Sequence, residues 1–277
     1  MRTTPRNPNP MEVLETAAKL MRLTGNQWSD WAYVTNNARA RRNLHTYLQM
    51  GCPTIDCLGG FDTPTVTDGE KIARLILGDD YLSPRDVVKA YGLCYSGDQK
   101  TSLAVTVPDL ETLLWLRAEG CILVATLTTE YNLLQLCEID NPVFCRKGDS
   151  WFAKPRHTFS REDVVQSGQW LVFRKGAYPG SNNGLWEEQS NLLTEVEYVP
   201  NVAEVVYAVQ TYYKARGIDL LKEVSVRTSS ITAHDGRVFV GSIGADGPSV
   251  CDFWDDGHKE NLGVSSALKL NLVSLNT

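Results

Sequence analysis

The sequence predicts an α+β protein: a helical N-terminal region, followed by helices packed on a mixed sheet that ends in an antiparallel β-meander. Three observations predict this class. Several segments place apolar residues three and four apart between capping residues and glycines, as amphipathic helices do. The run CILVATL at 121–127 is continuously apolar, as a strand covered on both faces is. Residues 224–254 alternate in polarity between Asp-Gly turns, as hairpins do.

Residues 1–50 are predicted to form a helical hairpin. Asn9 suits the cap of a first helix, which Gly25 ends, and Ser29 caps a second helix that ends near Gly51. At 3.6 residues per turn, the second helix has an apolar stripe and an opposing basic arc. This hairpin is the first predicted domain.

Charge is unevenly distributed along the 277 residues. Residues 1–50 hold seven Lys/Arg and three Asp/Glu, a net charge of +4, whereas residues 51–277 hold 20 and 30, a net charge of −10. We interpret the basic arc as a candidate binding surface for an acidic protein partner or a nucleic acid, because cations on one helix face can neutralise phosphates or carboxylates. The candidate residues are Arg39, Arg41, Arg42 and Trp31.

Residues 51–69, GCPTIDCLGGFDTPTVTDG, are predicted to be a linker loop, because loops of this length are uncommon inside a compact domain. The second predicted domain is an α+β domain over 70–277. It should begin with helices over 69–78 and 83–92. The second of these suits the first half of a helix-turn-helix, but GDQKTSLAVTVP at 97–108 reads as a poor helix with one lysine.

The rest of the second domain is predicted to alternate between helices and strands. A capped amphipathic helix precedes the apolar run at 121–127, and another follows it. The strand-like segments are WFAKP at 151–155 and QWLVFRKG at 169–176, and the strongest helical pattern covers 199–217. The meander over 224–254 should turn at Asp235-Gly236 and at Asp246-Gly247.

The stretch SVCDFWDDGHKENLG at 249–263 contains the one dense acidic cluster, formed by Asp252, Asp255, Asp256 and His258. A calcium loop of the EF-hand type would place Trp254 and Gly263 at ligand positions, and neither supplies the required carboxylate. Two interpretations stay open. The favoured one is a charged strand end followed by a polar loop; the other is the acidic cleft of a hydrolase.

Neither a metal site nor a cofactor is expected. The seven cysteines include no C-x-x-C pair, and the four histidines form no local ligand set. Phosphate-binding and dinucleotide-binding glycine patterns are absent. Scattered cysteines in apolar contexts predict reduced thiols and a cytoplasmic location, and the sequence shows no secretory signal and no apolar run long enough for a membrane span.

Several stretches resemble a family of uncharacterised bacterial proteins of unknown function. They include TVPDLETLLWLRAEGCILV, WEEQSNLLTEVEYVPNVAEVVYAVQTYYKARG and DGRVFVGSIGADG, and the resemblance covers roughly residues 80–270. It implies a bacterial, cytoplasmic setting and implies no mechanism.

Taken with the missing motifs, these observations predict an intracellular, non-enzymatic binding or interaction protein of unknown ligand. Two alternatives stay open: a hydrolase-type enzyme with an acidic cleft near the meander, and a nucleic-acid-binding protein that acts through the basic N-terminal helix. Whether the protein is an enzyme is therefore left undecided by the sequence.

Overall fold

The computed structural model describes residues 66–140, 150–245 and 247–270. These residues form helices and mixed β-sheets, so the α+β class predicted from the sequence is confirmed. The helical hairpin predicted over 1–50 lies outside the described residues, and so does the linker loop up to residue 65.

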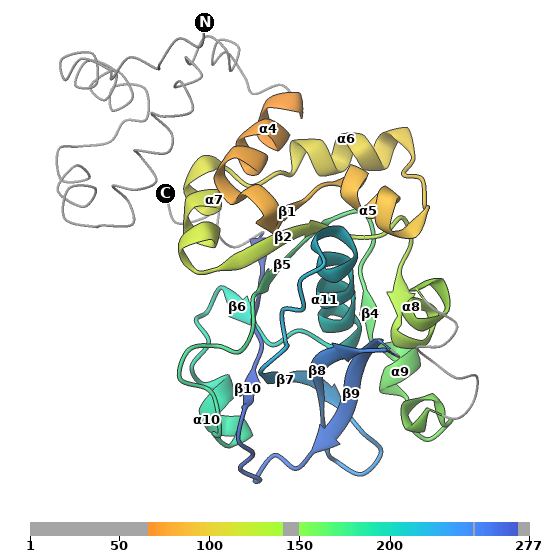
Figure 1. Cartoon of the computed structure of the whole chain (residues 1–277), viewed down its shortest axis with the longest axis vertical. Coiled ribbons are helices and arrows are strands. Elements are labelled where there is room, and N and C mark those ends of the chain that lie inside the picture. Colours follow the sequence, from red (N-terminus) through yellow and green to blue (C-terminus); the bar gives the residue numbers. More distant parts are fainter. Residues whose placement is uncertain (1–65, 141–149, 246, 271–277) are drawn as a thin grey trace, which may run out of the picture. The chain divides into compact units, whose positions relative to one another are not determined.

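A layer of helices opens the described part of the chain, at the top of Figure 1. Its helices are α4 (Val66–Leu77), α5 (Pro84–Tyr91), α6 (Gly97–Val105) and α7 (Leu110–Ala118), with the 3-10 turn η2 (Gly78–Asp80) and strand β1 (Tyr81–Leu82) between α4 and α5. Helix α4 packs against α6 and α7. It begins earlier than predicted: residues 66–69, which were expected to belong to the linker loop, are part of the helix.

Ser83 and Gly92 define the ends of α5, as their residue types predict. The Ser83 side chain accepts a hydrogen bond from the main-chain N–H of Asp86, and the Asp86 carboxylate accepts one from the main-chain N–H of Ser83 (2.9 Å). Gly92 ends the helix with a φ of 71°, a conformation that favours glycine.

Helix α6 corrects the expectation of a poor helix over 97–108. Ser96 and Gln99 form a reciprocal capping box at its start, which satisfies main-chain donors that would otherwise have no partner. Only Leu103 and Ala104 of this helix are buried, so its apolar pattern is weak although the helix is well capped.

A five-stranded sheet lies against this helical layer, with strand order β1-β2-β5-β11-β6. Strands β2 (Cys121–Ala125) and β5 (Trp170–Arg174) pair antiparallel near its centre, and every residue of both is buried. The apolar runs at 121–127 and 169–176 therefore form strands as predicted. The remaining members are β1, β6 (Glu197–Tyr198) and β11 (Ala267–Leu268).

The C-terminal sheet has the order β10-β7-β8-β9 and contains the predicted meander. Its strands are β7 (Ser225–Ile231), β8 (Arg237–Gly244), β9 (Gly247–Phe253) and β10 (Leu262–Val264). Strands β7, β8 and β9 pair antiparallel in sequence order, so the meander is confirmed. Asp235 occupies the first turn with a φ of 60°. Asp246, expected in the second turn, lies outside the described residues.

The long helix α11 (Val202–Arg216) contacts strands of the five-stranded and the four-stranded sheet and the helices α5 and α8, and is the central element of the core (Figure 1). Asn201 and Glu204 form a capping box at its start, and Gly217 ends it in the left-handed conformation, with a φ of 72°. In the helical pattern over 199–217, valines at i, i+3, i+4 and i+7 from Val202 predict a buried stripe that continues to Tyr213. The valines are buried, but Tyr213 is 45% exposed and Tyr212 is buried instead.

One short stretch, 262–268, belongs to both sheets. Strand β10 pairs parallel with β7, with Gly263 opposite Val226. Strand β11 pairs antiparallel with β5 and β6. Ser265 and Ser266, which lie between the two strands, are fully buried. This stretch therefore joins the edge of one sheet to the interior of the other.

The segment WFAKP is not the predicted strand. Its first residues form a 3-10 helix, η3 (Trp151–Ala153), because the Trp151 indole turns inward and donates a hydrogen bond to the carbonyl of Val250 on β9 (2.9 Å). The other elements are β3 (Tyr131–Asn132), α8 (Leu133–Asp140), α9 (Phe159–Glu162), β4 (Val164–Val165) and α10 (Trp186–Ser190). Among the described helices, none has the length and apolarity needed to cross a bilayer.

Candidate functional site

The acidic cluster lies at the end of β9 and in the loop that follows it. Asp252 is exposed on the strand, and Asp256 and His258 are exposed in the loop. His258 Nδ1 lies 2.6 Å from the main-chain carbonyl oxygen of Asn183. Asp255 is half-buried in an ion pair. Of the residues that the structure describes, no three His, Cys, Asp or Glu side chains are arranged to hold a metal ion.

Arg227, which was not identified from the sequence, holds this loop on the sheet. The residue lies on β7 and is fully buried. Its Nη2 donates to the carbonyl oxygens of Trp254 (3.1 Å) and Gly257 (2.8 Å), and its Nη1 donates to the Gly184 carbonyl (3.1 Å) and to Gln189 Oε1 (3.0 Å). Burial lowers the pKa of this guanidinium.

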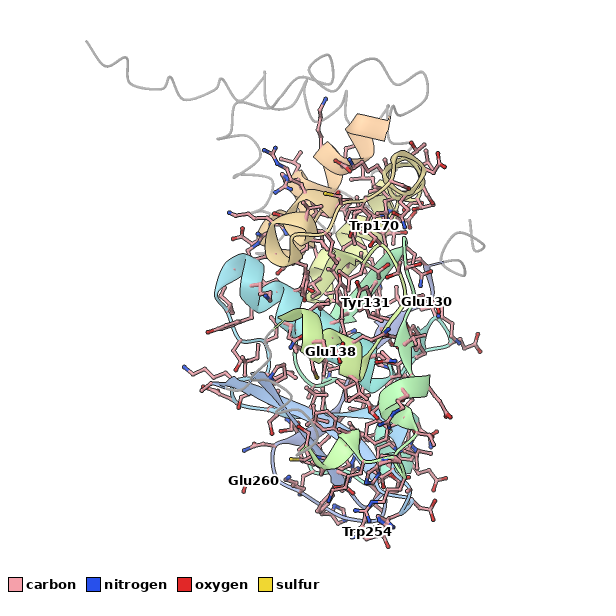
Figure 2. The ribbon with its side chains drawn as sticks, turned by 90° about the vertical axis from the view of Figure 1, so that its right-hand side faces the viewer. Glu130, Tyr131, Glu138, Trp170, Trp254 and Glu260 are labelled. Atoms are coloured by element: carbon pink, nitrogen blue, oxygen red, sulfur yellow. The ribbon has the colours of Figure 1, made fainter. Side chains whose placement is uncertain are left out.

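A second arginine, Arg237 on β8, holds the same loop on the sheet through an ion pair. It forms a bidentate pair with Asp255, with Nε–Oδ1 at 3.1 Å and Nη2–Oδ2 at 2.8 Å. Its guanidinium stacks 3.7 Å from the ring centroid of Trp186. The Trp186 main-chain N–H donates to the Asp255 carbonyl (3.0 Å). Asp255 thus has a structural role, whereas Trp254 projects outward, 58% exposed, at the end of the molecule distant from α4 (Figure 2).

A buried ion pair joins β5 to β6 and to the stretch 262–268. Arg174 donates to Glu119 Oε2 (2.9 Å), Glu197 Oε1 (3.3 Å) and Ser266 Oγ (3.2 Å). Burial alone would raise the pKa of Glu197, but hydrogen bonds from Thr194, Ser266 and Arg174 outweigh it and hold that pKa below its usual value. These charges therefore connect strands that are distant in sequence.

His157 is a buried imidazole in an aromatic cluster beside the edge of the meander. It is 2% exposed, its ring centroid lies 5.1 Å from that of Trp151, and its Nε2 accepts a hydrogen bond from Arg156 Nε (3.1 Å). Burial lowers the pKa of His157, and the nearby Arg156 and His234 lower it further, against the opposing effect of Asp252.

The free energy of unfolding should therefore rise with pH between about 5 and 7. The unfolded chain protonates this histidine near its ordinary pKa of 6.5, whereas the folded protein protonates it only at lower pH, so acid favours unfolding. The change His157→Gln should flatten this dependence. Urea unfolding at several pH values measures it, with His258→Gln at an exposed site as the matched control; equal slopes in the wild type and His157→Gln would contradict the assignment.

One candidate binding site is a pocket of about 430 Å³ between α4, α5 and α6. Its apolar lining comes from Pro84, Val88, Tyr95 and Ala104, and its polar lining from Glu70, Ser83, Arg85, Lys100 and Thr101. Two of these side chains have fixed orientations. The Tyr95 hydroxyl donates to the carbonyl oxygen of Thr126 (2.6 Å), and Ser83 Oγ donates to the Asp86 carboxylate (2.6 Å).

The rim of this pocket presents positive charge. Arg85 and Lys100 are exposed, and neither has an ion-pair partner among the residues that the structure describes. Nearby, the buried Tyr81 hydroxyl finds no hydrogen-bond partner in the described part of the chain. Burial, followed by the charge of Glu70, raises its pKa. The pocket thus combines apolar surface, two available cations and a neighbouring buried hydroxyl.

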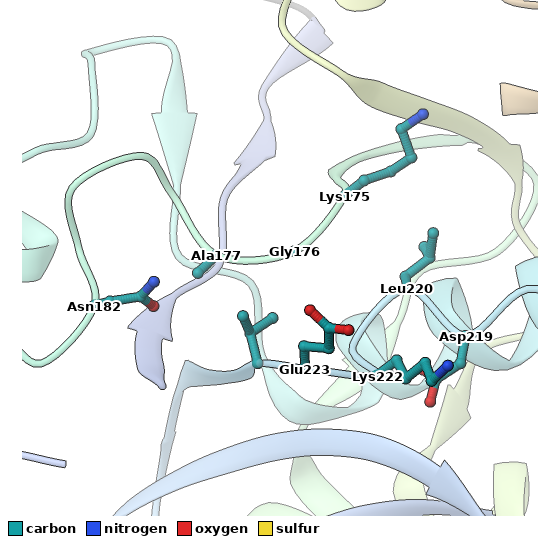
Figure 3. A pocket seen from close by; sticks show the side chains of 9 residues that line it. Lys175, Gly176, Ala177, Asn182, Asp219, Leu220, Lys222 and Glu223 are labelled. Carbon is teal, nitrogen blue, oxygen red and sulfur yellow. The ribbon is translucent and has the colours of Figure 1, made fainter. Parts of the chain in front are cut away.

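A second, more open pocket of about 400 Å³ lies between the loop after β5 and the segment 219–224. Figure 3 shows side chains of both signs around it. Lys175 is already paired with Asp80 (2.6 Å), and the Asp219 carboxylate accepts hydrogen bonds from the main-chain N–H groups of Leu221 and Ile243 (both 2.9 Å). Two of its charged groups therefore have structural partners, which makes it the weaker candidate.

The predicted binding residues Arg39, Arg41, Arg42 and Trp31 lie outside the described residues. Comparisons of the chain with protein-family models, with curated proteins and with solved structures found no match. A functional assignment therefore depends on the geometry of the chain's own residues.

Proposed function

We propose that this chain is an intracellular, non-enzymatic binding protein whose ligand site is the pocket between α4, α5 and α6. The observation that supports the proposal is the combination of a fixed apolar lining with two rim cations, Arg85 and Lys100, that lack a carboxylate partner among the described residues. Binding sites for small molecules are usually preformed concavities of roughly 300–1,000 Å³ with a few polar groups that set orientation. The volume of about 430 Å³ falls in this range.

A hydrolase built on the acidic cluster is the competing proposal. It would require Asp252, Asp255, Asp256 and His258 to act on one substrate. Asp255 is engaged by Arg237, and His258 contacts a main-chain carbonyl, so two of the four have structural partners. A hydrolase site would have to break these contacts, whereas the pocket between the helices can bind a ligand without breaking any. We favour the pocket for that reason.

The proposal is tested with a fluorescent probe, 1-anilinonaphthalene-8-sulfonate, titrated into the full chain. Saturable binding at one site is expected, because the probe pairs an apolar body with a negative charge. Thr101→Trp should abolish it by filling the pocket from an exposed position on α6. Ser102→Trp is the matched control, because Ser102 is exposed on the same helix and does not line the pocket. Equal binding by both variants, or no binding by the wild type, would refute the proposal.

The basic composition of residues 1–50 supports nucleic-acid binding as a second candidate function, because this segment holds a net charge of +4 in a chain whose net charge is −6. If Arg39, Arg41 and Arg42 neutralise about three phosphates, the log–log slope of affinity against salt should be near −2.7 on duplex DNA and about −2 on single strands. Replacing all three with Gln should remove most of this slope while changing stability by no more than about 0.5 kcal/mol.

The charge-matched control for that prediction replaces Arg85, Lys89 and Lys100, three exposed cations of α5 and α6, with Gln. Fluorescence anisotropy with labelled duplex DNA at several salt concentrations gives the slope of affinity against salt for each of the two triple variants. A wild type without measurable affinity at low salt, or a control variant that loses the same slope, excludes the N-terminal arginines as the contact.

For its location, we propose the cytoplasm of a bacterial cell. Among the described residues, Cys121 is buried in the core as a free thiol, and Cys94 and Cys251 are exposed free thiols. Free thiols persist in a reducing compartment, which supports this location. The bacterial setting depends on the resemblance to uncharacterised bacterial proteins.

A further inference from the structure

We propose that the occupant of the pocket between α4, α5 and α6 is a small amphipathic monoanion: an apolar body of about eight carbons that ends in one carboxylate. The inference depends on the proposed function, because it assigns a ligand class to the same site. Two features of the pocket support it: its apolar lining and the balance of charge at its rim.

The apolar lining determines the body of the ligand. Pro84, Val88 and Ala104 contribute aliphatic surface, and Tyr95 contributes an aromatic side chain whose hydroxyl is already satisfied by a main-chain carbonyl. None of these groups offers a free polar atom to a ligand. Each methylene that such a surface removes from water tightens binding by about fourfold. A chain of about eight carbons fits within the volume of about 430 Å³.

The charges at the rim determine the head group. Arg85 is in the first turn of α5 and Lys100 is on α6, so two cations from different helices line one pocket. A guanidinium binds a carboxylate through two parallel hydrogen bonds, a geometry that neither an alcohol nor an amine can reproduce. Glu70 also lines the pocket and leaves an excess of one positive charge, which favours a monoanion over a dianion.

The buried hydroxyl of Tyr81 lies near the pocket but does not line it, so it does not identify the occupant. Tyr81 is fully buried, and its hydroxyl has no hydrogen-bond partner among the described residues, a condition that is rare unless water or a ligand supplies one. Its ring lies 5.4 Å below the guanidinium of Arg74, which donates to Ser83 Oγ (3.2 Å) in the pocket lining. A buried water molecule would satisfy this group.

The test uses isothermal titration calorimetry of the full chain with three ligands of equal length: octanoate, 1-octanol and octylammonium. Octanoate should bind about tenfold more tightly than 1-octanol, and octylammonium should bind most weakly. The double variant Arg85→Gln/Lys100→Gln should lose the preference for octanoate and keep its affinity for 1-octanol. Lys89→Gln, an exposed change on α5 outside the pocket lining, should retain the preference.

The outcomes separate the two proposals. If the three ligands bind equally, or octylammonium binds best, and Thr101→Trp blocks all binding, the ligand class is wrong and the pocket remains the binding site. If no ligand binds, or binding survives Thr101→Trp, the pocket is not the ligand site and both proposals fail. A preference for octanoate that survives the double variant would also overturn the assignment, because the rim cations would then not determine it.

Discussion

Replacing Arg227 with leucine should lower the free energy of unfolding by about 3 kcal/mol, and the melting temperature by about 10 °C. The wild-type guanidinium donates to three main-chain carbonyls and to the side-chain oxygen of Gln189. Leucine leaves these buried acceptors unsatisfied, although it removes the cost of burying a charge, so the loss is smaller than the sum of four hydrogen bonds. Chemical unfolding with urea measures the change.

The same variant should loosen the loop at 254–257. Lys259, just beyond that loop, is exposed, so trypsin should cleave after it faster in Arg227→Leu than in the wild type under native conditions. The cleavage rate of Arg227→Lys should lie between those of Arg227→Leu and the wild type, because lysine keeps the positive charge but cannot donate the paired hydrogen bonds of a guanidinium. Arg85→Gln, at an exposed and unpaired arginine, is the control and should change stability by no more than about 0.5 kcal/mol. A wild-type melting curve for Arg227→Leu would show that the loop is held by other contacts.

The change Gly263→Ala should lower the free energy of unfolding by about 2–3 kcal/mol. A Cβ atom at this position on β10 would lie 2.5 Å from Ser181 Oγ, 2.6 Å from the Cβ of Ala177 and 2.9 Å from Asn182 Oδ1. All three belong to the loop after β5, so either the loop or the pairing of β10 with β7 must shift. Gly97→Ala is the control, because no atom lies within 4 Å of its added Cβ. Differential scanning calorimetry should separate the two variants clearly, and similar melting temperatures would contradict the close approach.

Elements with local signals were predicted well from the sequence. The helix predicted over 199–217 is α11, and the structure shows that Asn201 and Glu204 cap its start and Gly217 ends it. The meander follows from alternation and from a turn at Asp235, which adopts the positive φ that such turns require. In both cases the interactions that define the element lie within a few residues of one another.

Other elements were misread because the deciding interaction was weak or distant. Helix α6 buries only Leu103 and Ala104, so its apolar period was too weak to recognise, although its capping box is visible in the sequence. Within five residues, the aromatic pair in WFAKP does not distinguish a strand from a 3-10 turn. The turn is stabilised in part by the hydrogen bond from Trp151 to Val250, 99 residues away.

The candidate site was the least predictable part. In the strand VSVRTSS, Arg227 alternates with Val224 and Val226 and reads as a solvent-facing residue. Its hydrogen-bond partners lie 27 to 43 residues away in the sequence and cover it. The pocket between the helices depends on Glu70, Arg85 and Lys100 from three different helices. Their convergence is a property of how α4, α5 and α6 pack, which no single stretch of sequence encodes.

The stretch 262–268 also constrains the order in which the protein can acquire its structure during translation. Strands β10 and β11 are synthesised after every other strand described, yet β11 lies inside its sheet, between β5 and β6. Until residue 268 has left the ribosome, the edges of β5 and β7 that these strands cover remain unpaired, and unpaired strand edges are templates for aggregation. A nascent chain would therefore benefit most from a chaperone in the interval between the synthesis of β9 and that of β11.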